Sequence, residues 1–103
     1  MKRLFALATV ALAVSACGSP QANFVDNCRG MAMDEGLGED GANIACACAY
    51  DRLATTYSAG EIRQAGELLA IESDEDLRAA VARIDNGEAL LENTESAVKS
   101  CAM

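Results

Sequence analysis

The sequence predicts an all-α protein, a small bundle of about five short helices cross-linked by two disulfides. Apolar side chains recur at helical spacing in five segments, three of which open with a helix-start signal. No stretch alternates apolar and polar residues for long enough to form a strand. Four cysteines follow residue 20 in a chain of 103 residues. Because a domain of this size has a thin core, disulfides are expected to supplement its stability.

Two helices are expected on either side of an acidic, glycine-rich loop. Ser19 and Pro20 are typical of an N-cap followed by proline, so the first helix should run to about Met33. Residues 34–41 hold three glycines and four acids, which predicts the loop. The second helix should extend from about Gly41 to Tyr57. The inward faces of these helices are expected to be Phe24, Cys28 and Met31 in the first, and Cys46, Tyr50, Leu53 and Tyr57 in the second.

Three further helices should follow. Ser58 and Glu61 match a capping box, and Ser73 repeats the start signal before an acidic first turn. Asn86 and Gly87 are expected to close the helix that Ser73 opens, as a glycine C-cap does. The three inward faces are expected to be Ile62, Ala65, Leu68 and Leu69; then Leu77, Ala80, Val81 and Ile84; then Leu90, Thr94, Ala97, Val98 and Cys101.

The first 17 residues carry a targeting signal. Lys2 and Arg3 precede residues 4–14, which are almost entirely apolar but too few to span a bilayer. The next residues, Val14-Ser15-Ala16-Cys17, resemble the lipobox of bacterial lipoprotein precursors. This resemblance implies cleavage after Ala16 and attachment of lipid to Cys17. Gly18, in place of aspartate, implies sorting to the outer membrane.

The expected organisation follows from this signal. Residues 1–16 would be a signal peptide, 17–19 the lipidated cysteine with a short linker, and 20–103 the helical domain. The alternative is an ordinary secreted protein that is cut after Ala16, in which Cys17 is a spare thiol.

The remaining cysteines, Cys28, Cys46, Cys48 and Cys101, are an even set in a small exported chain, which favours two structural disulfides. A bridge between Cys46 and Cys48 is excluded because residues two apart on a helix point about 200° apart. Two pairings stay open. We expect Cys46–Cys101 and Cys28–Cys48, because Cys101 and Cys46 both face inward. The cysteine arrangement also resembles that of small uncharacterised helical envelope proteins, a resemblance that implies no activity.

Charge and composition exclude several functions. Without Lys2 and Arg3, the chain keeps 6 basic side chains against its 16 acidic ones, a net charge of −10 that argues against nucleic-acid binding. The absence of histidine removes the usual base of nucleophilic catalysis and the imidazole ligands of zinc sites. Residues 34–40 do not match a calcium loop. We therefore expect neither an enzyme nor a bound metal or cofactor.

The sequence predicts a lipid-anchored interaction module on the periplasmic face of the outer membrane, acting as an assembly accessory or inhibitor-type binding protein. Its partners would be the membrane, through the lipid on Cys17, and another envelope protein. Glu88, Glu92 and Glu95 form a row at i, i+4 and i+7 and are the candidate contact residues. The alternative is a thiol-redox or Cu(I)-handling protein that uses Cys46 and Cys48 with Cys28, Met31 and Met33.

Overall fold

A computed structural model describes residues 19–103 of the chain. These residues form five helices and no strand: α2 (Pro20–Asp34), α3 (Glu39–Leu53), α4 (Ala59–Leu69), α5 (Asp74–Ala82) and α6 (Gly87–Ala102). The prediction of a small all-α bundle with two disulfides is confirmed. The predicted signal peptide, lipobox and Cys17 lie outside the described residues.

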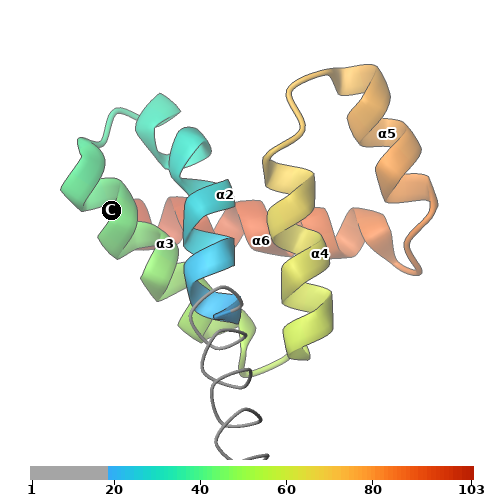
Figure 1. The fold of residues 1–103 in the computed structure, drawn as a ribbon, viewed down its shortest axis with the longest axis horizontal. Coiled ribbons are helices and arrows are strands. Elements are labelled where there is room, and N and C mark those ends of the chain that lie inside the picture. The colour runs from blue at the N-terminus through green and yellow to red at the C-terminus, as the bar shows by residue number, and fades with distance from the viewer. Residues whose placement is uncertain (1–18) are drawn as a thin grey trace, which may run out of the picture.

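The helices pack in two layers (Figure 1). Helices α2, α3 and α4 lie in front, and α6 crosses behind them along the longest dimension of the domain. Helix α2 packs extensively against both α3 and α4, while α3 also packs extensively against α6. Helix α5 stands at one end, and its contacts with α4 and α6 are few. Its attachment to the bundle is therefore the weakest.

The three start signals act as N-caps, as the sequence predicts. The Ser19 hydroxyl oxygen accepts from the Ala22 N–H at 3.4 Å, and that of Ser73 accepts from the Asp76 N–H at 3.4 Å. Ser58 and Glu61 form the complete capping box, in which each side chain accepts from the backbone N–H of the other residue. These bonds satisfy N–H groups that have no partner within the helix.

Helix α3 differs from its predicted limits at both ends. It begins at Glu39 rather than Gly41, which shortens the loop and puts Glu39 and Asp40 in the first turn, where carboxylates stabilise the helix dipole. It ends at Leu53 rather than Tyr57. The Thr55 hydroxyl donates to the carbonyl of Arg52 at 2.8 Å, a side-chain bond that competes with continuation of the helix.

The prediction that Asn86 and Gly87 close the preceding helix is wrong. Helix α5 ends at Ala82, and Asn86, in the left-handed conformation at φ 57°, is instead the N-cap of α6. Gly87 is the first, buried residue of α6. A Cβ at this position would collide with the carbonyl oxygen of Val81. Glycine is needed here because the start of α6 packs directly against the backbone of α5.

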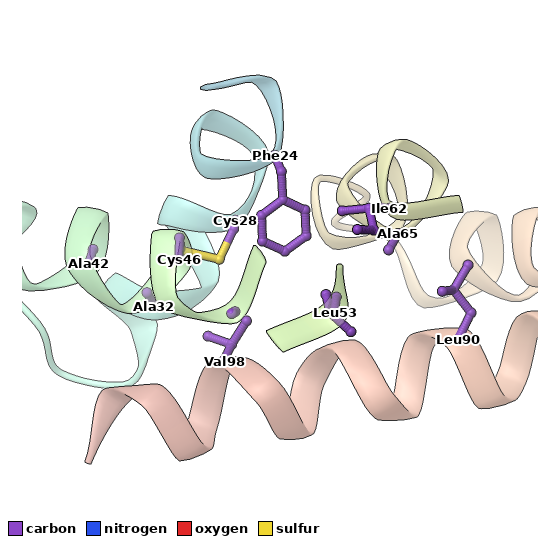
Figure 2. Packing of buried hydrophobic residues seen from close by; sticks show 11 residues of the cluster. Phe24, Cys28, Ala32, Ala42, Cys46, Leu53, Ile62, Ala65, Leu90 and Val98 are labelled. Atoms are coloured by element: carbon purple, nitrogen blue, oxygen red, sulfur yellow. A yellow bond between two sulfur atoms is a disulfide. The ribbon is translucent and has the colours of Figure 1, made fainter. Parts of the chain in front are cut away.

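The core lies where α2, α3, α4 and α6 meet (Figure 2). Phe24 is its largest side chain, and its ring lies between α3 and α4 at 5.9 Å from the ring of Tyr50. Small residues separate the helices elsewhere, which permits close backbone approach. The buried alanines are Ala32, Ala42, Ala45, Ala49 and Ala65. All the predicted inward positions are buried or partly buried, although none on α5 is fully buried.

Candidate functional site

The four structural cysteines form two disulfides, but with the pairing that we did not expect. Cys28 is bonded to Cys46 and Cys48 to Cys101, with the Cα atoms of each pair 6.0 Å apart. The expected pairing, Cys46–Cys101 and Cys28–Cys48, is wrong. Cys28 and Cys46 are fully buried, whereas Cys48 and Cys101 are partly exposed.

The position of α3 between two neighbours explains this pairing. Helix α3 packs against α2 on one side and α6 on another. Because Cys46 and Cys48 point about 200° apart, they serve different neighbours. Cys46 meets Cys28 of α2, and Cys48 meets Cys101 of α6. Two cysteines that both face inward therefore need not pair, because α3 has neighbours on two of its sides.

The three cysteines of the candidate redox or copper site are all bonded in disulfides. Cys28 and Cys46 form one bridge and Cys48 belongs to the other, so neither a redox thiol nor a Cu(I) thiolate is available from them without reduction. Met31 packs against the core, while Met33 is 46% exposed, so the two methionines do not converge. Between residues 19 and 103, no three His, Cys, Asp or Glu side chains are grouped closely enough to hold a metal ion.

The predicted acidic row lies on α6, but its three members differ in environment. Glu88 and Glu92 are exposed, whereas Glu95 is partly buried. Glu88 is in the first turn of α6, where a carboxylate stabilises the helix dipole. The described part of the chain contains two ion pairs, Asp26–Arg29 and Arg63–Glu67, so no member of the row is paired within it.

Two neighbouring hollows lie along this part of α6. The apolar groove, of about 730 Å³, runs between α5 and α6, and its main apolar side chains are Leu77, Val81, Ile84 and Leu91. The acidic cleft, of about 660 Å³, lies between the ends of α2 and α4 and the middle of α6. Its carboxylates belong to Asp34, Glu72 and Glu95.

The sequence did not single out Asp34 and Glu72 as partners of Glu95. The three acids come from α2, the loop after α4, and α6, so no sequence spacing connects them. One local signal was present for Asp34. It is the last residue of α2, where a carboxylate opposes the helix dipole, so helix stability does not explain it.

A third hollow, of about 390 Å³, lies between the end of α3 and α6. Two hydrogen bonds cross it. Arg52 Nη1 donates to Ser100 Oγ at 2.7 Å, and Asn93 Nδ2 donates to Tyr57 Oη at 2.7 Å. These bonds help to hold α6 on α3, and no charged group is left without a partner there. The sole buried polar residue among residues 19–103 is Thr94, whose hydroxyl donates to the carbonyl of Leu90.

No known protein family, curated protein or solved structure is detectably similar to the chain. Within residues 19–103, every helix is too short or too polar to cross a bilayer. The fold and surface together define a disulfide-linked helical domain that carries an excess of unpaired carboxylates.

Proposed function

We propose that the protein is a lipid-anchored, periplasm-facing interaction module of the bacterial envelope, and that it binds another envelope protein as an assembly accessory or an inhibitor. The observation that carries this proposal is the unpaired acidic surface. Residues 17–103 hold 16 acidic and 6 basic side chains, and only two carboxylates of the described residues form ion pairs. Such a surface attracts a basic partner and speeds its encounter.

The position of the first helix limits the reach of the domain. Helix α2 begins at Pro20, and the lipobox resemblance puts the lipid on Cys17, so only two residues separate them. A linker this short holds the domain next to the membrane. Repulsion from anionic lipid turns the acidic face away from the bilayer. We therefore infer that the partner sits at the same membrane surface.

The first prediction concerns the anchor. Replacing Cys17 by alanine removes the thiol that lipid attachment requires, so labelled fatty acid should no longer enter the protein and the protein should leave the membrane fraction. The measurement is metabolic labelling combined with membrane fractionation. Ile44→Ala is the control, since Ile44 is 71% exposed in the domain and its truncation should leave both signals unchanged. A Cys17→Ala protein that stays in the membrane pellet would show that the lipoprotein proposal is wrong.

The second prediction concerns the acidic row. Reversal of Glu88, Glu92 and Glu95 to lysine should reduce recovery of the partner after crosslinking in intact cells. The loss should be larger at low salt, because screening weakens attraction between exposed charges. The fold should tolerate the change, since the buried face of α6 is Leu90, Thr94 and Val98. Recovery that is unchanged by the triple reversal and insensitive to salt would place the binding surface elsewhere.

A further inference from the structure

We propose that the apolar groove and the acidic cleft form one docking site for a single segment of a partner protein. The segment would carry apolar side chains flanked by lysine or arginine. This inference rests on the proposed function, contact with a basic partner, and it assigns that contact to a particular face of the domain.

The two hollows are continuous. Leu77 of α5 and Leu91 of α6 line both of them. On α6, Glu88 lines the groove and Glu95 lines the cleft, with Leu91 between them. These three positions follow i, i+3 and i+7, so they share one face of the helix over about 10 Å. A segment lying along this face would therefore contact both hollows at once.

The apolar groove provides the hydrophobic part of the contact. Helix α5 and the turn after it have a clear apolar side in Leu77, Val81 and Ile84, yet none of these residues is fully buried. Its neighbours α4 and α6 cover that side only in part. Apolar side chains of a partner would complete the burial, which is the main driving force for association. This is the arrangement by which an apolar segment docks in a groove.

The charges identify what must flank those apolar side chains. Asp34, Glu72 and Glu95 line the cleft, and none of them is in an ion pair within the described residues. Asp34 opposes the dipole of α2, and Glu95 is partly buried in the middle of α6, so neither position favours stability. Arg78 is the one cation among the described residues that line the two hollows. A lysine or arginine of the partner would satisfy the carboxylates of the cleft.

The test measures binding of model peptides to the purified full-length protein in uncharged detergent. The probe is a fluorescent peptide of about 15 residues with leucine at helical spacing and lysine elsewhere. The comparison peptide has glutamate in place of every lysine. Fluorescence anisotropy gives the dissociation constants. We expect the lysine peptide to bind and the glutamate peptide to bind at least about tenfold more weakly.

Paired charge variants locate the binding site. Asp34→Lys with Glu95→Lys should weaken binding of the lysine peptide about tenfold or more. The matched control is Asp40→Lys with Asp51→Lys, which makes the same change in net charge. Both residues are exposed, on the first and last turns of α3, and they line neither hollow. The control should weaken binding by less than about threefold. Because the detergent affects all variants alike, it does not change this comparison.

A second pair of variants tests the groove. Val81→Ser, on a helix without buried residues, should weaken binding severalfold without unfolding the domain. Ile44→Ser is the matched control, because Ile44 is 71% exposed and outside both hollows. Circular dichroism verifies that each variant keeps its helices.

The outcomes separate this inference from the proposed function. If both charge pairs weaken binding equally, the acidic surface binds without a defined site, and the docking inference is wrong while the proposed function stands. If Val81→Ser has no more effect than Ile44→Ser, the groove takes no part and the inference is again wrong. If the glutamate peptide binds as well as the lysine peptide, the inference and the acidic contact both fail.

Discussion

Breaking the Cys48–Cys101 disulfide by changing both residues to alanine should lower the free energy of unfolding by about 4 kcal/mol. The two cysteines are 53 residues apart in sequence, so the bridge closes a long loop and strongly restricts the unfolded chain. It also fastens α6 to α3, and α6 supplies Leu90 and Val98 to the core. A loss of this size approaches the whole stability of a small domain, and urea unfolding followed by circular dichroism measures it.

The single variant Cys48→Ala is the matched control for this prediction. It breaks the same bridge but leaves the Cys101 side chain in place, so it should lose nearly as much stability as the double variant. If the free energy of unfolding of the double variant is within about 1 kcal/mol of that of the unchanged protein, helix packing and the hydrogen bonds from α6 to Arg52 and Tyr57 would suffice to hold α6.

The features that the sequence predicted well are those determined by residues that are close together in the chain. Ser19, Ser58 and Ser73 each cap a helix because the acceptor and the N–H lie three residues apart in the chain. The burial of Phe24, Cys28 and Cys46 likewise follows from helical spacing of apolar residues. Such local and periodic signals were enough for the fold class and for the starts of three of the five helices, α2, α4 and α5.

The features that the sequence did not predict depend on how the helices pack against one another. The disulfide pairing required knowledge that α3 lies between α2 and α6. Gly87 was assigned to the end of α5, although its role is to let α6 start against the Val81 carbonyl. The acidic cleft joins three separate elements. In each case spacing along the chain holds no information about the contact, because packing between helices determines it.

Replacing Phe24 by alanine should also cost a large part of the stability, about 3 to 4 kcal/mol. Phe24 is 1% exposed and is the largest fully buried side chain of the described residues. Its ring touches the aromatic ring of Tyr50 and fills the space beside Gly66, where a Cβ would lie 3.3 Å from Phe24 Cδ1. Because α2 and α4 meet at this point, the cavity left by alanine cannot close without moving one of the helices.

Ile44→Ala is the control for the Phe24 variant. Ile44 is 71% exposed on α3, so its truncation should change the free energy of unfolding by no more than about 0.5 kcal/mol. Both variants keep the two disulfides, and the unfolded chains are therefore equally constrained. The difference between them then reports packing around the ring alone. A loss below about 1 kcal/mol for Phe24→Ala would mean that the disulfides and the α3–α6 contact hold the domain together without close packing of α4 on α2.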